Sequence, residues 1–237
     1  GEPFPQGTGG SNSFRIPALV TLSDGTLIAA ADARWNSTLD NGGIDTIVSR
    51  STDKGANWDF YFANYLGDNG DTYNQNSTCF IDPALAVTSN DTIYMLVDLY
   101  PYGVAIANSA AHRAETNVTG FGPDATAKSY GKLLLSNNDH TSYDYYLDGT
   151  VIRDADGNAV DGYTVDSHFN LSQNGTYVSN LFFSDSPYKV QRTGYLYLTK
   201  STNEGLSWSS PTLLRQAGSV SAFLRHFPQI FAKHPAE

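Results

Sequence analysis

The feature that most constrains the fold of this chain is a turn motif that occurs twice, at residues 51–58 and 201–208. In the pattern Ser-x-Asp/Asn-x-Gly-x-x-Trp, the Asp or Asn side chain can accept hydrogen bonds from nearby backbone N–H groups, and the glycine adopts a conformation that bulkier residues avoid. The tryptophan folds back and buries a large apolar area. A repeated supersecondary unit predicts a fold built from repeated units. The motif residues are Ser51, Asp53, Gly55, Trp58, Ser201, Asn203, Gly205 and Trp208.

The sequence around the first copy predicts four short antiparallel strands. Aromatic and β-branched runs are separated by turn residues, and the dipeptide Asp24-Gly25 is typical of a tight hairpin. Four consecutive antiparallel strands form a β-meander, which is the blade of a β-propeller. The expected strands are residues 18–22, 27–33, 44–50 and 58–63.

The strand pattern restarts once, so we predict an all-β fold of propeller type in which this chain covers about two blades. A polar, Tyr-rich interruption at roughly 101–190 predicts an inserted β-rich region with turns at 147–150 and 154–158, and an Ala-rich stretch at 102–115 suggests one helix. The atypical tail, 216–237, fits either an amphipathic helix or an aberrant end. The expected strands of the second blade are residues 83–87, 92–98, 194–200 and 208–214.

Two blades cannot close a propeller and would leave strand edges unpaired. The chain is therefore either a fragment or a unit that assembles with further copies, and we expect a fragment. Because the chain begins at Gly1 without a signal peptide, we also expect a leader or a preceding domain outside it.

Composition excludes several classes of function. The formal net charge of −10 argues against nucleic acid or an anionic membrane as the partner. Cys79 is the single cysteine, so no intrachain disulfide forms, and no apolar run is long enough for a membrane span. The five histidines are scattered and do not cluster with Cys79, so we expect no metal and no cofactor.

Two arginines and one aspartate carry the candidate chemistry. Arg15 lies in Phe14-Arg15-Ile16-Pro17 directly before an expected strand, Arg34 ends the next strand, and Asp40 follows six residues later in a Gly-rich loop. A guanidinium is permanently charged and can bind a carboxylate through two parallel hydrogen bonds. The alternatives are a surface salt bridge for Arg15 and a plain turn carboxylate for Asp40, with Asp45 as its nearest competitor.

This order of Arg, Arg, Asp and repeated turn resembles the bacterial exo-sialidases with Asp-box repeats. The resemblance implies that Arg15 and Arg34 bind the sialic acid carboxylate and that Asp40 is the general acid/base. It also implies that Asp82, in Phe80-Ile81-Asp82-Pro83, contacts the far side of the sugar near its 4-hydroxyl and amide, although a strand-start cap explains Asp82 equally well. The resemblance extends over residues 5–214.

Several catalytic and substrate-binding residues of the family have no match in this chain. Sialidases use a Tyr nucleophile with a Glu partner, and a third Arg, from blades beyond the second Asp-box, and no such group follows Trp208 in a matching context. The resemblance thus implies the N-terminal part of the catalytic domain of a retaining exo-sialidase, a glycoside hydrolase. Its partners would be sialylated glycans and the remaining propeller blades, in a bacterial protein that is secreted or on the cell surface. The alternatives are a lectin-like propeller that binds sialic acid without cleaving it, and an Asp-box propeller that acts on another glycan.

Overall fold

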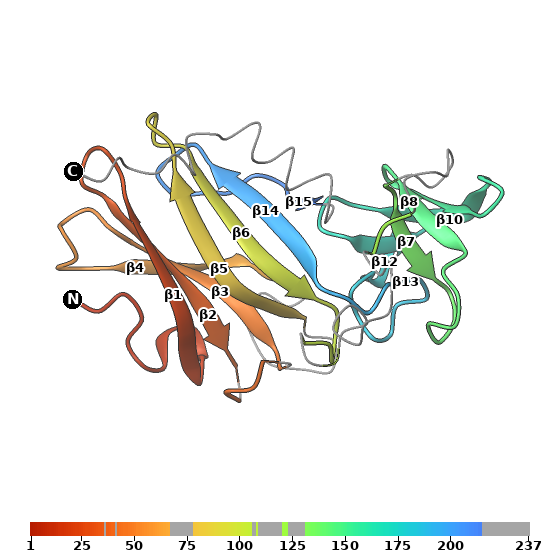
Figure 1. Cartoon of the computed structure of the whole chain (residues 1–237), viewed down its shortest axis with the longest axis horizontal. Helices are drawn as coiled ribbons and strands as arrows, with labels where there is room; N and C mark the ends of the chain where they lie inside the picture. The colour runs from red at the N-terminus through yellow and green to blue at the C-terminus, as the bar shows by residue number, and fades with distance from the viewer. Residues whose placement is uncertain are drawn as a thin grey trace, which may run out of the picture.

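The computed structural model describes residues 1–35, 37–40, 42–66, 78–105, 108, 120–122 and 131–214. The described residues form two β-sheets, seen on the left and the right of Figure 1, and include a short 3₁₀ turn, Thr8–Gly10. Among these residues no helix is long and apolar enough to cross a membrane. The tail 216–237 and most of the expected helix 102–115 lie outside the described residues. Of the described part, Tyr102 to Ala105 are not helical and Asn108 has a 3₁₀ conformation.

The first sheet consists of two four-stranded antiparallel meanders. One isolated parallel pairing, Ile44 with Cys79, joins β3 to β5 and so joins the two meanders. This is the arrangement expected for two consecutive blades. The strands of the first meander are β1 (Ser13–Thr21), β2 (Leu27–Arg34), β3 (Ile44–Ser51) and β4 (Asp59–Asn64), and those of the second are β5 (Cys79–Val87), β6 (Ile93–Tyr100), β14 (Tyr195–Ser201) and β15 (Thr212–Leu214).

The second sheet has seven strands and comes from the chain between β6 and β14. The expected turns at 147–150 and 154–158 are confirmed, because each connects two paired strands of this sheet. One apolar cluster contains residues of both sheets, so they share a core. The strands are β7 (Leu133–Ser136), β8 (Tyr145–Asp148), β9 (Val151–Asp154), β10 (Ala159–Val165), β11 (Asn170–Gln173), β12 (Thr176–Asn180) and β13 (Lys189–Val190).

The eight strands expected in the two blades are all present, but β1 already begins at Ser13 rather than at 18, and β5 begins at Cys79 rather than at 83. The expectation that the last one begins at Trp208 is wrong, since β15 begins at Thr212. Pro211 lacks an N–H group and so cannot donate to a ladder. Between Trp208 and β15, Ser209 instead exchanges bonds with Lys200: its N–H donates to the Lys200 carbonyl, and its Oγ accepts the Lys200 N–H.

The two X-Pro segments lie inside strands. The register of β1 against β2 shifts after Arg15, and the register of β5 against β6 shifts after Ile81, so each segment forms a β-bulge. The residues before the prolines, Ile16 and Asp82, have φ values of 52° and 60°. The expectations that Arg15 precedes a strand and that Asp82 marks a strand entrance are therefore wrong. A bulge leaves the proline unpaired while the ladder continues on both sides of it.

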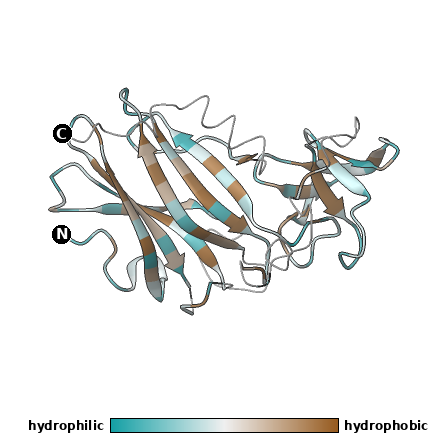
Figure 2. Cartoon of the chain, viewed as in Figure 1, coloured by the Kyte–Doolittle hydropathy of each residue, from teal (hydrophilic) through white to brown (hydrophobic). Residues whose placement is uncertain are grey.

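β2 is buried on both faces, which explains why most of its residues are apolar. Ala29, Ala31 and Ala33 pack in one small cluster, whereas Ile28 and Ala30 face the large core cluster. Other strands alternate more clearly between buried and partly exposed residues, as the first six residues of β6 do. Figure 2 shows the corresponding alternation of hydrophobic and hydrophilic residues.

The two repeated turns have the same hydrogen bonds. Ser51 Oγ donates to Asp53 Oδ1 (2.8 Å) and accepts from the Gly55 N–H (2.9 Å). Ser201, Asn203 and Gly205 repeat this with distances of 2.9 and 3.0 Å. The expectation that asparagine is tolerated in the second copy is confirmed, because the Oδ1 of either residue accepts the backbone N–H four residues on.

The tryptophans of the two turns differ in their partners. Trp58 Nε1 donates to the Gly55 carbonyl of its own turn (3.1 Å), whereas Trp208 Nε1 donates to the hydroxyl of Tyr61 in β4 (2.7 Å). The Tyr61 hydroxyl in turn donates to the Gly205 carbonyl. Tyr61 thus connects the first blade to the turn of the second.

Tyr61→Phe should lower the free energy of unfolding by about 1–3 kcal/mol, because the Trp208 N–H and the Gly205 carbonyl both lose their partner. Tyr163→Phe is the control, since it keeps a ring that packs against Tyr188 and the Tyr163 hydroxyl has no hydrogen bond within the described residues. Urea unfolding followed by tryptophan fluorescence measures both variants. Equal loss in the two variants would contradict a role for Tyr61 in joining the blades.

Candidate functional site

The site begins at the last three residues of β2. Asp32 and Arg34 follow Ile28 and Ala30 on the same face of the strand, so the apolar core continues directly into a charged pair. The side chain of Asp32 is 0% exposed and that of Arg34 is 1% exposed. Two opposite charges buried this deeply must satisfy each other, because neither has access to water.

Asp32 connects the two blades through its two oxygens. Its Oδ2 accepts a hydrogen bond from Arg34 Nη2 (2.8 Å), and its Oδ1 accepts the backbone N–H of Asp82 (2.9 Å) in the bulge of β5. Burial raises the pKa of Asp32 to about 6, although the bonds from Arg34 and from the Asp82 N–H act in the opposite direction. Asp32 therefore fixes the guanidinium of the first blade against the bulge of the second.

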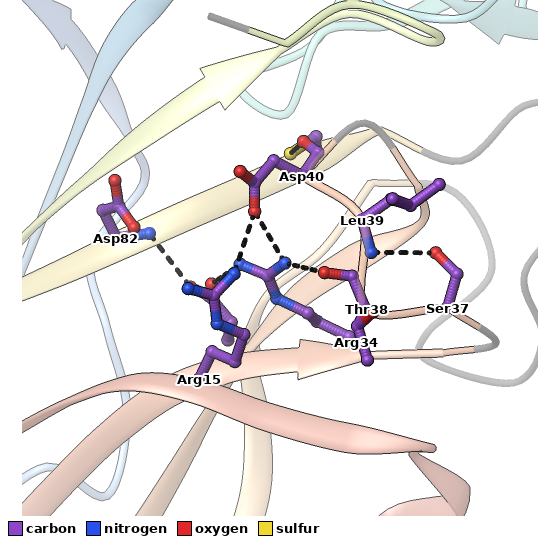
Figure 3. A network of polar contacts seen from close by, with 9 residues as sticks. Arg15, Arg34, Ser37, Thr38, Leu39, Asp40 and Asp82 are labelled. Atoms are coloured by element: carbon purple, nitrogen blue, oxygen red, sulfur yellow. Dashed lines mark hydrogen bonds and ion pairs between the residues drawn. The ribbon is translucent and has the colours of Figure 1, made fainter.

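Arg15 and Arg34 converge on one carboxylate oxygen. Asp40 Oδ1 lies 2.7 Å from Arg34 Nη1 and 3.3 Å from Arg15 Nη1. Figure 3 shows both guanidinium groups pointing at Asp40, while Arg34 Nη1 also donates to the Thr38 carbonyl (2.7 Å). Arg15 and Asp40 have side chains 49% and 51% exposed, so this end of the network is open to solvent whereas the Asp32 end is closed.

These groups line one cavity of about 220 Å³. The structure thus brings together all four residues selected from the sequence: Arg15, Arg34, Asp40 and Asp82. It adds Asp98 and Tyr100 from β6, which sequence reasoning missed. The full lining comprises Arg15, Ile16, Arg34, Asp40, Ile81, Asp82, Asp98 and Tyr100.

The repeat itself could have revealed Asp98. In the first blade Asp32 pairs with Arg15, directly before the bulge of β1, and in the second blade Asp98 pairs with Ile81, directly before the bulge of β5. Burial, and secondarily the charge of Asp82, raises the pKa of Asp98 to about 6. The carboxyl group of Asp98 has no hydrogen bond to any described residue. A carboxyl group in this setting can accept a hydrogen bond from a hydroxyl or N–H group of a ligand.

Two other polar groups near the site do not line the cavity. Asp45, the competitor of Asp40, is buried and accepts a hydrogen bond from Trp35 Nε1 (2.9 Å). Cys79 donates its thiol to the Asp40 carbonyl (3.1 Å), and burial raises its pKa far above the ordinary value. Cys79 is therefore a structural thiol rather than a nucleophile, because the reactive form is the thiolate.

No family model matches the chain. An anhydrosialidase of Macrobdella decora is 30% identical over 257 residues, which covers 90% of the chain and 33% of that relative. The chain is a sialidase homologue. The solved structure of the leech intramolecular trans-sialidase complexed with 2,7-anhydro-Neu5Ac is 28% identical, with a TM-score of 0.75 over 90% of the chain and 37% of that protein. That of the intramolecular trans-sialidase from Ruminococcus gnavus in complex with oseltamivir carboxylate is also 28% identical, with a TM-score of 0.70 over 86% and 49%.

The sialidase homologue spans about a third of the length of the curated relatives that it matches. The two meanders of its first sheet are blades of the sialidase propeller, since these structures match most of the chain. The cavity with the two arginines lies between these two blades, because β1 and β2 belong to one and β5 and β6 to the other.

Arg34→Ala should reduce the free energy of unfolding by about 3–5 kcal/mol, because it leaves the buried Asp32 carboxylate without its partner. Arg15→Ala, at the solvent end of the same network, should change it by less than about 1 kcal/mol. Chemical denaturation of both variants measures this contrast. A large loss in Arg15→Ala would show that Arg15 holds the fold together and is not held available for a ligand.

Burial raises the pKa of Asp45 to about 7 from the usual 3.8, so the folded state binds a proton more tightly than the unfolded state. The free energy of unfolding should therefore fall as the pH rises from about 4 to about 7. Asp45→Asn retains an acceptor for Trp35 and removes this titration, so it should match the parent chain near pH 4 and exceed it by a few kcal/mol at pH 7. Urea unfolding across this pH range measures the difference, and a constant difference would contradict it.

Proposed function

We propose that this chain forms part of an exo-sialidase that releases terminal sialic acid from glycoconjugates with retention of configuration. The observation that carries the proposal is the convergence of Arg15 and Arg34 on a single carboxylate oxygen of Asp40 in an open cavity. A pair of guanidinium groups that shares one carboxylate oxygen is also suited to the carboxylate of a sugar acid.

In this proposal the substrate carboxylate replaces Asp40 between the two guanidinium groups. Arg34 is already held by Asp32, so it needs no reorientation to receive the ligand. Asp40, released from both arginines, then takes up a proton from solvent and donates it to the leaving glycosidic oxygen. The carboxylate that this step regenerates later accepts a proton from the attacking water as a base. This exchange couples binding to catalysis, because Asp40 becomes free to transfer a proton only when a carboxylate occupies its place.

The remaining catalytic groups are assigned to blades outside the described residues. By the resemblance, a Tyr attacks the anomeric carbon to form a covalent intermediate, a Glu assists it, and a third Arg completes the carboxylate site. Asp82 and Asp98 line the cavity beside the arginines, so we assign them to the hydroxyl and amide groups of the sugar. Under this proposal the two repeated turns are Asp-boxes, and the intact protein is a bacterial enzyme that is secreted or on the cell surface.

A second candidate is intramolecular transfer, in which a hydroxyl group of the sialic acid replaces water and an anhydro sugar is released. The relatives described above favour it, because one is an anhydrosialidase and two are intramolecular trans-sialidases. Proton NMR of the product distinguishes 2,7-anhydro-Neu5Ac from free sialic acid in a protein that includes the following blades. The lectin-like alternative, with binding and no product, is the third outcome of the same assay.

The first test is binding of 3′-sialyllactose to the purified 237-residue chain. Arg15→Ala should weaken the affinity about tenfold or more, because one charge-assisted hydrogen-bond pair is lost. Asp40→Asn should tighten it, because an amide competes poorly with the substrate carboxylate for the two guanidinium groups. Isothermal titration calorimetry measures both variants.

The methyl ester of the same ligand is the control for charge, and it should bind weakly to every variant. Equal binding of ester and acid, or weaker binding by Asp40→Asn, would contradict the proposed exchange. Release of a fluorophore from an aryl sialoside should be absent from this chain alone. Turnover that disappears in Asp40→Asn would show that the nucleophile lies within these 237 residues.

A further inference from the structure

A second cavity, of about 180 Å³, lies where the chain leaves β6 and meets the second sheet. Pro101, Tyr102 and Phe182 are among the residues that line it. The Tyr102 N–H donates to the Phe182 carbonyl (3.0 Å), so a backbone hydrogen bond fixes the junction. Tyr100 lines the cavity with the two arginines, so the two cavities are lined by consecutive residues of the chain.

The second cavity is basic in a chain with a formal net charge of −10. Its lining includes His140, Lys189 and Arg192, against one carboxylate among the described lining residues, that of Asp139. Neither Lys189 nor Arg192 forms an ion pair with any described residue. Burial, and next the charges of Arg192 and Lys189, hold the pKa of His140 below its ordinary value, so the positive field reaches the imidazole.

The loop between β7 and β8 holds His140 in place. Asn138 Oδ1 accepts bonds from the N–H and the hydroxyl of Thr141, at 2.9 and 3.0 Å, which closes the loop around His140. His140 Nδ1 lies 3.0 Å from the Tyr143 hydroxyl. Within the described residues Nε2 has no hydrogen-bond partner, so it remains available to a ligand.

Leu181, Phe182 and Phe183 also line the cavity, but they are 1%, 1% and 6% exposed and so contribute little surface to it. The charged side chains of Lys189 and Arg192 therefore carry the recognition. A guanidinium and an ammonium group suit an anionic substituent on a sugar.

We infer that this cavity binds an anionic group of a glycan, a carboxylate or a sulfate ester, beside the cavity with the two arginines. The inference rests on the proposed function, since a glycan bound in the first cavity would bring its neighbouring groups to the second. Two adjacent sites on one ligand raise the effective concentration of the second group. The second cavity would therefore favour glycans with two acidic groups over those with one.

The test uses the 237-residue chain labelled with ¹³C and ¹⁵N, with Arg15→Ala to weaken the first cavity. 3′-Sialyllactose and lactose 3′-sulfate are titrated separately, and the imidazole signals of His140 and the amide signals of residues 181–183 are followed by NMR. In the Arg15→Ala background both probes should still shift these signals. Adding Arg192→Ala should weaken this binding about tenfold. Lys200→Ala removes an exposed cation from β14 and is the matched control, which should have no effect.

The outcomes separate this inference from the proposed function. Shifts from only one probe would identify the source of the anionic group as a sialic acid or a sulfate ester. Shifts that depend on Arg15 and not on Arg192 would leave the proposed function standing and overturn the second site. Shifts that depend on Arg192 and persist in Arg15→Ala are the expected result and would support the second site. An equal loss of probe affinity in Arg192→Ala and Lys200→Ala would show that the effect depends on net charge alone, and it would overturn the inference.

Discussion

The buried pair of Asp32 and Arg34 is the interaction on which the site depends. Removing two charges from water is costly, and each member of this pair makes further hydrogen bonds that fix another part of the structure. Asp32 also accepts the Asp82 N–H from the second blade, and Arg34 also holds Asp40 and the Thr38 carbonyl. One ion pair therefore sets the relative position of two blades, one loop and the guanidinium of Arg34 that lines the cavity.

The two blades repeat the same backbone with different chemistry. Each has a proline bulge in its first strand and an aspartate opposite the residue before that bulge. The first blade places Arg15 and Arg34 around its aspartate, and the second places Ile81 and Tyr100 around Asp98 at the matching positions. The repeat thus supplies a rigid frame, and substitutions at a few equivalent positions make a charged binding wall from one copy and a less polar wall from the other.

The sequence predicted what depends on neighbouring residues. Strand alternation, the turn at Gly149 and the equivalence of Asp53 with Asn203 follow from local side-chain pattern and backbone conformation, and the structure confirms them. The bulges at Ile16 and Asp82 were missed because a positive φ at a non-glycine residue is locally unfavourable. Pairing with the adjacent strand and the Asp32 bond maintain that conformation, and neither is visible in a short window of sequence.

By itself, the sequence determined the all-β class, the blade repeat and the four candidate site residues, because period-2 patterning and short motifs are local properties. Only the tertiary structure showed that Arg15, Arg34, Asp40 and Asp82 meet at one cavity, that Arg34 is buried and that Asp98 joins them. It also revealed the basic cavity at Arg192. Residues from separate strands become neighbours only when the blades pack, and burial then decides which charges hold the fold and which remain free for a ligand.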